Sequence, residues 1–80
     1  MSSYTDPSRY AVAITPHDTT EIANGQLTRG IYVGGAGNIV AIVGGNAITF
    51  NGCVAGTVLP IRCSRVNSTN TTATNLVALF

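Results

Sequence analysis

The chain has 80 residues, of which 45% are hydrophobic and 9% charged, with four arginines, no lysine and a net charge of +1. An ordinary soluble domain carries about 25% charged residues. The small net charge argues against strong binding to nucleic acid through neutralised phosphates. No apolar run approaches the length of about 20 residues that a membrane-spanning helix needs. A domain this small is marginally stable alone, and an uncharged surface is weakly protected against association. We therefore expect a homo-oligomer.

Residues 1–9 are polar and contain Pro7, which interrupts regular structure. We predict an N-terminal arm here, either a disordered tail or a strap that orders against a neighbouring subunit. The arm lacks the basic region and apolar core of a secretory signal, so we expect synthesis in a host cytoplasm. Residues 10–80 form the single predicted β domain.

The first predicted strand covers residues 10–15, where bulky side chains alternate with small ones. This period of two places Tyr10, Val12 and Ile14 on one face of the strand. The segment after the next proline, residues 18–21, fits two interpretations. It forms either one helical turn that begins with a capping box or a plain loop.

From residue 29 onward, short apolar runs alternate with Gly-rich or polar turns. This pattern is typical of a sandwich or barrel made of hairpins. We therefore predict an all-β fold, a small antiparallel β-sandwich or barrel of about five to six short strands. The later predicted strands are residues 30–34, 38–43, 47–51, 57–66 (the longest) and 75–80.

Two of these strands carry further information. Residues 39–43 are apolar on both faces, which predicts a strand that is central in its sheet or covered by a partner. Pro60 cannot donate a backbone hydrogen bond, so its strand is predicted to lie at an edge or to be bulged. An open edge is a place where another chain can add.

The two cysteines, Cys53 and Cys63, raise the question of a disulfide. A hairpin through residues 46–66, turning near residues 54–56, would place the two roughly 20 Å apart along a strand. A disulfide requires α-carbons within about 7 Å. We therefore predict two reduced thiols that act as small apolar residues.

The sequence offers few residues for chemistry. His17 is the only histidine, and no nucleophile, second base or carboxylate cluster accompanies it. Residues 34–37 resemble a phosphate-binding loop, but a predicted strand follows where such a loop needs a helix, so we predict turns that require positive φ. The acidic residues are scattered, and residues 67–74 predict an exposed hairpin loop. We predict no catalytic, cofactor-binding or metal site, and a protein that is not an enzyme.

Five segments, in their order and spacing, resemble the small spike-base and head decoration proteins of gene transfer agents and related tailed phages. These proteins share a Thr-Pro-x-Asp-Thr-Thr segment, an Arg-Gly-hydrophobic-Tyr-Val-Gly-Gly-x-Gly segment, and an Ala-Gly-x-hydrophobic-Leu-Pro-hydrophobic-Arg segment. The two cysteines depart from the family pattern, where other small residues are expected. The matching segments here are residues 14–20, 29–37, 54–62, 65–69 and 77–80.

The resemblance implies a virion structural protein on the outer surface of a bacteriophage-like head. A spike base forms an oligomeric platform at capsid vertices and carries a fibre, whereas a cement protein binds the capsid shell at local threefold positions. The expected partners are the major capsid protein, a head fibre protein, or both. The expected oligomer is a trimer or a pentamer.

Aromatic side chains are enriched at the centres of protein interfaces, so Tyr10, Tyr32 and Phe80 are candidate interface anchors. Each of them also fits an ordinary position in the core. Arg29 is a candidate contact to a capsid carboxylate, and it equally fits a solvated arginine.

A second class of protein remains open: a small β-barrel binding module outside the virion, for single-stranded nucleic acid or another protein. Such binders use a basic groove lined by aromatic residues. Arg62 and Arg65 would lie on opposite faces of one predicted strand, so they form no groove. No nucleic-acid partner is expected.

Overall fold

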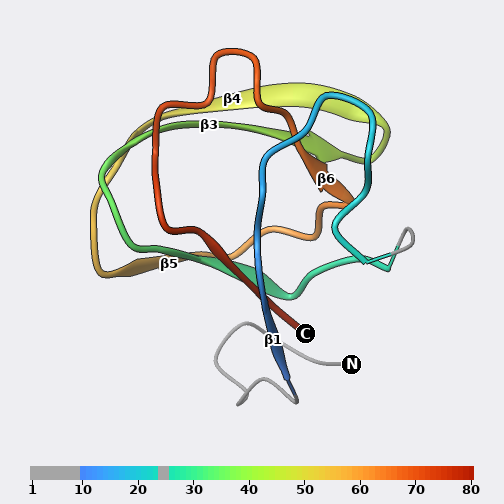
Figure 1. The fold of residues 1–80 in the computed structure, drawn as a ribbon, viewed down its shortest axis with the longest axis horizontal. Coiled ribbons are helices and arrows are strands. Elements are labelled where there is room, and N and C mark those ends of the chain that lie inside the picture. The colour runs from blue at the N-terminus through green and yellow to red at the C-terminus, as the bar shows by residue number, and fades with distance from the viewer. Residues whose placement is uncertain (1–9, 24–25) are drawn as a thin grey trace.

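The structure is a computed structural model that describes residues 10–23 and 26–80. Seven strands and no helix are found among these residues (Figure 1), which confirms the predicted all-β fold with somewhat more strands than expected. No helix in this part of the chain is long and apolar enough to cross a membrane. The strands are β1 (Ala11–Ala13), β2 (Gly30–Val33), β3 (Gly37–Val43), β4 (Asn46–Cys53), β5 (Thr57–Leu59), β6 (Arg65–Val66) and β7 (Val77–Leu79).

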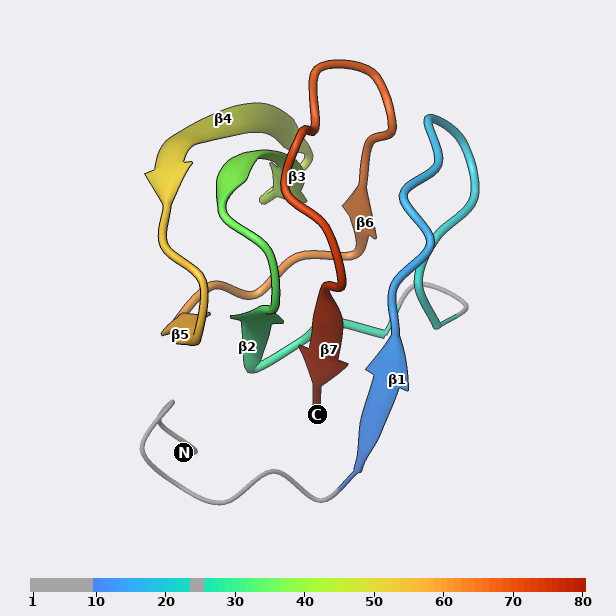
Figure 2. The same ribbon diagram turned by 60° about the vertical axis from the view of Figure 1, so that its left-hand side comes forward.

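The strands form two antiparallel sheets. One sheet has the order β1-β7-β2-β5 and the other the order β4-β3-β6. Figure 2 shows the strands of the first sheet side by side below β3 and β4. Buried side chains from both sheets and from the segments between them form one core, as expected when two sheets pack face to face. Its members are Ile31, Val33, Ile39, Ala41, Cys63, Val66, Ala73 and Leu76.

The central position predicted for residues 39–43 is confirmed. β3 lies between β4 and β6, and Ile39, Val40 and Ala41 are all buried. β3 turns into β4 through Gly44 and Gly45, whose φ angles of 59° and 83° fit the two-residue hairpin turn that favours glycine.

The single long strand predicted over residues 57–66 is wrong. The segment divides into β5 and β6, which belong to different sheets. β5 is an edge strand, as its proline predicted, and Pro60 follows it directly because a residue without an N–H cannot continue the ladder. Residues 60–64 then cross from one sheet to the other. Buried Thr28 holds this crossing: its Oγ1 donates to the Ile61 carbonyl (2.8 Å) and accepts from the Cys63 N–H (3.1 Å).

The predicted hairpin through residues 46–66 is also wrong. β4 pairs with β3, and β5 pairs with β2, so the register that separated the two cysteines does not exist. Both thiols are nevertheless free, as predicted, with Cys63 in the core and Cys53 half-buried. Burial raises the pKa of each thiol, and the hydroxyl of Thr28 offsets part of the effect at Cys63.

Of the two interpretations for residues 18–21, the loop is correct and the helical turn is wrong. Asp18 does not cap a helix, because its carboxylate accepts the backbone N–H and the hydroxyl of Thr69 (2.9 and 2.5 Å). These bonds lower the pKa of Asp18 below its ordinary value. The turn is instead closed by His17, whose Nδ1 accepts the backbone N–H groups of Thr19 and Thr20, both at 3.1 Å.

The prediction of positive φ is wrong for Gly34 and Gly35, because neither residue has a positive φ angle. Glycine is required at both positions because the segment of residues 74–75 passes too close to leave room for a side chain. A Cβ on Gly34 would lie 2.5 Å from the carbonyl oxygen of Asn75, and a Cβ on Gly35 would overlap the hydroxyl of Thr74.

The predicted hairpin loop at residues 67–74 joins β6 to β7, which lie in different sheets, so it is no hairpin. Its middle part runs along β3. The hydroxyls of Thr71 and Thr72 accept the N–H groups of Val40 and Asn38 (3.0 and 2.8 Å). These threonines therefore replace a strand at the edge of the second sheet.

Candidate protein interaction surface

The first sheet has one face in the core and one face turned outward. Residues that are directly paired across antiparallel strands point to the same side. One row joins Val12, Ala78, Ile31 and Leu59, and it faces the core. The neighbouring rows therefore face outward, and every side chain in them is apolar. We call these residues the outer apolar face: Ala11, Ala13, Tyr32, Val58, Val77 and Leu79.

The outer apolar face is accessible. Tyr32 and Val58 each keep 41% of their surface exposed, and Ala11 and Ala13 are exposed as well. Gly30, in the same face, leaves room for its neighbours: a Cβ there would lie 3.0 Å from the side chain of Val58. A monomer rarely exposes a contiguous apolar patch without a role in interaction.

Two of the predicted anchors meet at one end of this sheet. The rings of Tyr10 and Phe80 stack with centroids 4.9 Å apart and planes 15° from parallel, and the backbone N–H of Phe80 donates to the carbonyl of Tyr10 (3.0 Å). Phe80 is buried, whereas Tyr10 is 47% exposed and donates its hydroxyl to Gln26 (2.6 Å). Phe80 therefore supports Tyr10, which presents its outer side to solvent.

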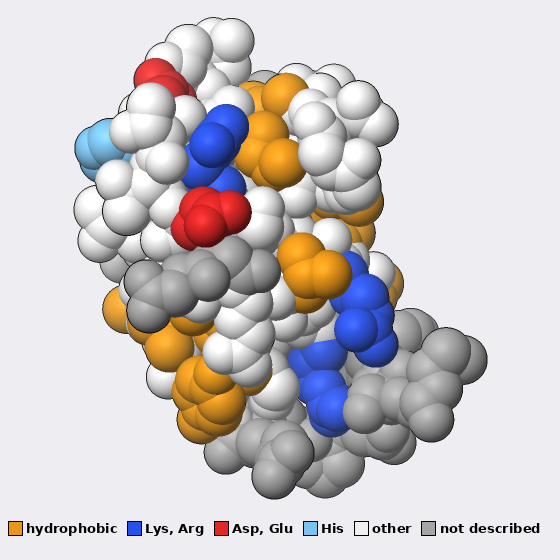
Figure 3. Space-filling model, turned by 90° about the vertical axis from the view of Figure 1, so that its right-hand side faces the viewer, with side chains coloured by type: hydrophobic (Ala, Val, Ile, Leu, Met, Phe, Trp, Pro, Cys, Tyr) orange, Lys and Arg blue, Asp and Glu red, His pale blue; other side chains and the backbone are white. Residues whose placement is uncertain are grey.

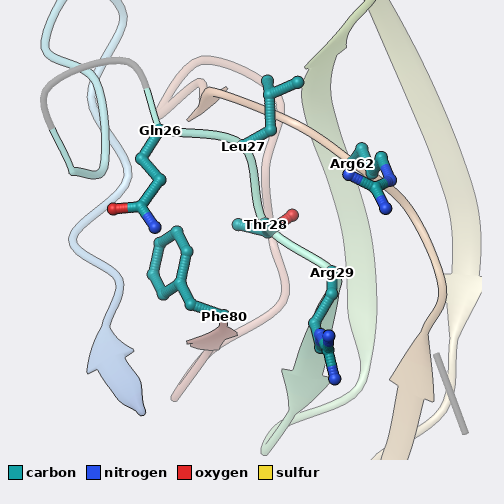
Figure 4. Close-up of a pocket in the computed structure, with 6 residues that line it drawn as sticks. All are labelled: Gln26, Leu27, Thr28, Arg29, Arg62 and Phe80. Carbon is teal, nitrogen blue, oxygen red and sulfur yellow. The ribbon is translucent and has the colours of Figure 1, made fainter. Parts of the chain in front are cut away.

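An open cavity of about 150 Å³ lies beside this stack (Figure 4). Its lining residues are Gln26, Leu27, Thr28, Arg29, Arg62 and Phe80. Figure 4 shows Gln26 and Phe80 on one side of Thr28 and the two arginines on the other. Arg29 comes from the segment that leads into β2 and Arg62 from the crossing after β5, so the fold brings together two positive charges that are distant in sequence.

Among the residues that the structure describes, no acidic side chain lines this cavity. Figure 3 shows one face of the molecule, on which one acidic side chain lies directly beside the upper basic side chains. Arginine binds carboxylates through paired N–H groups, so Arg62 in the lining of this cavity suits a carboxylate.

The structure thus places the four predicted interface residues on or beside the first sheet. Tyr10, Phe80 and Arg29 lie near one another around the cavity, and Tyr32 lies in the outer apolar face. Sequence reasoning missed Val58 as part of this face. The false long strand over residues 57–66 hid its pairing with β2, although the alternation of apolar residues was a signal that could have revealed it.

Within the described residues, no group of three or more His, Cys, Asp or Glu side chains is placed to hold a metal ion. The side chain of His17 closes a turn, because its Nδ1 accepts the backbone N–H groups of Thr19 and Thr20.

Comparison with known proteins defines the class to which the chain belongs. It is similar to a chain of the solved structure described as "Capsid of native GTA particle computed with C5 symmetry", where GTA denotes a gene transfer agent. The two chains are 32% identical, with a TM-score of 0.82, and the match covers 100% of this chain and 92% of that one. No protein-family model and no curated protein matches the chain.

Identity at this level over the full chain shows common descent, and the shared all-β fold agrees with it. The class is that of structural proteins of phage-like particles. The chain belongs to the same family as this protein of the gene transfer agent capsid.

Proposed function

We propose that the chain is a head spike-base subunit that forms a symmetric homo-oligomer on the outer surface of a phage-like capsid. The observation that carries the proposal is the full-length relationship to a chain of a gene transfer agent capsid. That capsid was computed with C5 symmetry, which is compatible with a five-membered platform at a vertex. The oligomer that we propose is a pentamer, and the alternative is the trimer of a cement protein.

The outer apolar face is the proposed contact to the major capsid protein. Its apolar rows carry no charge that would have to be desolvated, and Tyr32 lies among them as an aromatic anchor. Arg62, which lines the neighbouring cavity, would donate hydrogen bonds to a carboxylate of the capsid at the rim, and Arg29 in the same lining stays the contact predicted from the sequence. Tyr10 adds an exposed ring edge, held in place by Phe80.

A cyclic oligomer suits a surface of this kind. A few exposed apolar residues per subunit make a small interface, and small interfaces are individually weak. When several copies are joined, the binding of one raises the effective concentration of the others at the capsid. The assembled ring then holds the vertex firmly, and its opposite side remains available for a fibre protein.

The test combines solution mass with capsid binding. Light scattering over a range of concentrations should give the mass of a pentamer, and the protein should co-sediment with capsids assembled without it. Tyr32→Ser and Val58→Ser should each weaken co-sedimentation at least about tenfold while the protein stays folded. Val54→Ser is the matched control, because Val54 is 61% exposed but lies in the turn before β5, outside the outer apolar face.

Two results would contradict the proposal. Capsid binding that is unchanged in both variants would remove the outer apolar face from the interface. A salt-sensitive complex with single-stranded oligonucleotides, together with no binding to capsids, would favour the independent binding module.

A further inference from the structure

The outer edge of β4 carries backbone groups that nothing in the described chain pairs. The carbonyls of Val40 and Ile42 accept N–H groups from Asn67 and Ser64, on the β6 side of β3. In an antiparallel ladder, successive residues point their backbone groups to opposite edges. Ala41, which lies between Val40 and Ile42, therefore bonds to its partner Ile48 on β4. The residues on either side of Ile48, Ala47 and Thr49, point their N–H and C=O groups to the opposite, outer edge of β4.

This edge lacks the devices by which proteins protect open strands. β4 has eight residues, the most of any strand, and contains no charged residue and no proline. Its burial pattern is exposed at nearly every position. Natural proteins protect such edges with lysine, proline, inward charges or a covering segment, because an open edge is a template for another strand. An unprotected edge of this length is expected where a partner covers it.

A second open edge lies on β1. The Phe80 N–H donates to the Tyr10 carbonyl and the Ile14 N–H donates to the Leu76 carbonyl (3.0 and 2.9 Å), so Tyr10, Val12 and Ile14 bond inward to β7. By the same alternation, Ala11 and Ala13 point their backbone groups outward. Like Ala47 and Thr49 on β4, they are two exposed residues, spaced two apart, with small uncharged side chains.

The remaining edges are less suited to strand addition. β5 has three residues, and Pro60 follows it directly. The outer side of β6 is already covered, because the N–H groups of His17 and Ile22 donate to the carbonyls of Val66 and Ser64 (2.9 and 3.0 Å). Among the described residues, β4 and β1 are therefore the two edges with matching open groups.

We propose that β4 of one copy pairs with β1 of the next copy, so that the three-stranded sheet of one subunit continues into the four-stranded sheet of its neighbour. The occupant is a second copy because the open groups of the two edges match in number and spacing and neither edge carries charge. The edges lie on different sheets at opposite ends of the subunit (Figure 2). A contact between two different surfaces is head-to-tail, and repeated head-to-tail contacts form a ring when the rotation between successive copies closes, as the proposed oligomer requires. The inference rests on the proposed function, since it names the contact between copies in that oligomer.

Amide hydrogen exchange of the assembled protein tests the pairing directly. In the oligomer, the amides of Ala11, Ala13, Ala47 and Thr49 should exchange at least about 100-fold more slowly than in the dilute monomer, because a bonded amide exchanges only when the interface opens. The exposed amide of Val54, in the turn, serves as the control and should not change. An oligomer of the expected mass in which the four amides exchange freely would overturn the pairing and leave the capsid role intact.

Proline variants separate this pairing from other contacts. Ala13→Pro and Thr49→Pro each remove one outward N–H and no bond of the subunit's own sheets, and proline is tolerated at such edge positions. Each variant alone should lose the ring. An equal mixture should form dimers, because the intact β4 of the first pairs with the intact β1 of the second. Thr49→Val, which keeps the N–H, should assemble like the wild type.

The other outcomes are also decisive. Dimers of Ala13→Pro alone would show that β4 pairs with β4 of another copy, which overturns the proposal. Rings formed by either proline variant would do the same. If a proline variant fails to fold, as judged by its circular dichroism, Ala13→Lys and Thr49→Lys replace it, because an edge lysine blocks strand addition without touching the backbone. If the wild type remains a monomer in solution and on capsids, both the pairing and the proposed oligomer fail together.

Discussion

Replacing Thr28 with valine should destabilise the fold, although valine has the same shape and is more hydrophobic. The side chain of Thr28 is fully buried, and its hydroxyl serves the Ile61 carbonyl and the Cys63 N–H at once. Valine would leave the buried N–H of Cys63 and the partly buried carbonyl of Ile61 without their hydrogen bonds, at about 1–3 kcal/mol each. Valine also has no hydroxyl that must be desolvated on folding, which offsets part of this cost. We expect the free energy of unfolding to fall by about 2–4 kcal/mol.

That loss is large for this chain. A domain of this size has a stability of roughly 4–12 kcal/mol, so the melting temperature should fall by on the order of 10–25 °C. Thr28→Ser is the matched variant: it keeps the hydroxyl, loses one methyl group and should cost about 1 kcal/mol. The assay is urea and thermal unfolding followed by circular dichroism at one fixed protein concentration, because association shifts apparent stability. A valine variant as stable as the serine variant would refute the bridging role of the hydroxyl.

Three other predictions concern single groups. Gly34→Ala should cost about 1–3 kcal/mol in the same unfolding assay, because the added Cβ meets backbone; an unchanged midpoint would contradict the close approach. Mass spectrometry of maleimide-treated protein should show half-buried Cys53 labelled in the folded state and buried Cys63 labelled only as the protein unfolds, and equal rates would contradict this. The bonds from Thr69 lower the pKa of Asp18, so their contribution is present above its ordinary pKa and lost as the pH falls through the lowered folded value. Asp18→Asn should therefore be less stable than the wild type at pH 7, and the two should converge in strong acid.

The fold class was predictable because its signals are local. Alternating apolar residues and glycine turns report on strands wherever they occur. The double-sided apolar run in β3 correctly indicated a central strand. Which strand pairs with which was beyond the sequence, and the prediction over residues 57–66 shows why. A proline that ends one edge strand and a buried threonine from elsewhere in the chain together divert the backbone to the other sheet.

The candidate interface was only partly predictable, for a related reason. Tyr10 and Tyr32 were found by residue type alone, since exposed aromatic rings are common in interfaces. The face that surrounds Tyr32 depends on the registers among four strands. The cavity depends on the crossing segment, which brings Arg62 to the same lining as Arg29. Such sites require knowledge of non-local pairing, which a single sequence does not contain.

In the proposed oligomer, the outer apolar face and the open edges have complementary roles. Strand pairing between edges is directional, so it would fix the geometry of the proposed ring. The two residues that carry the open backbone groups of each edge have small side chains, so their pairing would bury little apolar surface. A hydrophobic contact through the outer apolar face is not directional, and it contributes stability through the apolar area that it removes from water. In the proposed assembly, neighbouring copies and the capsid therefore hold a subunit through two different surfaces.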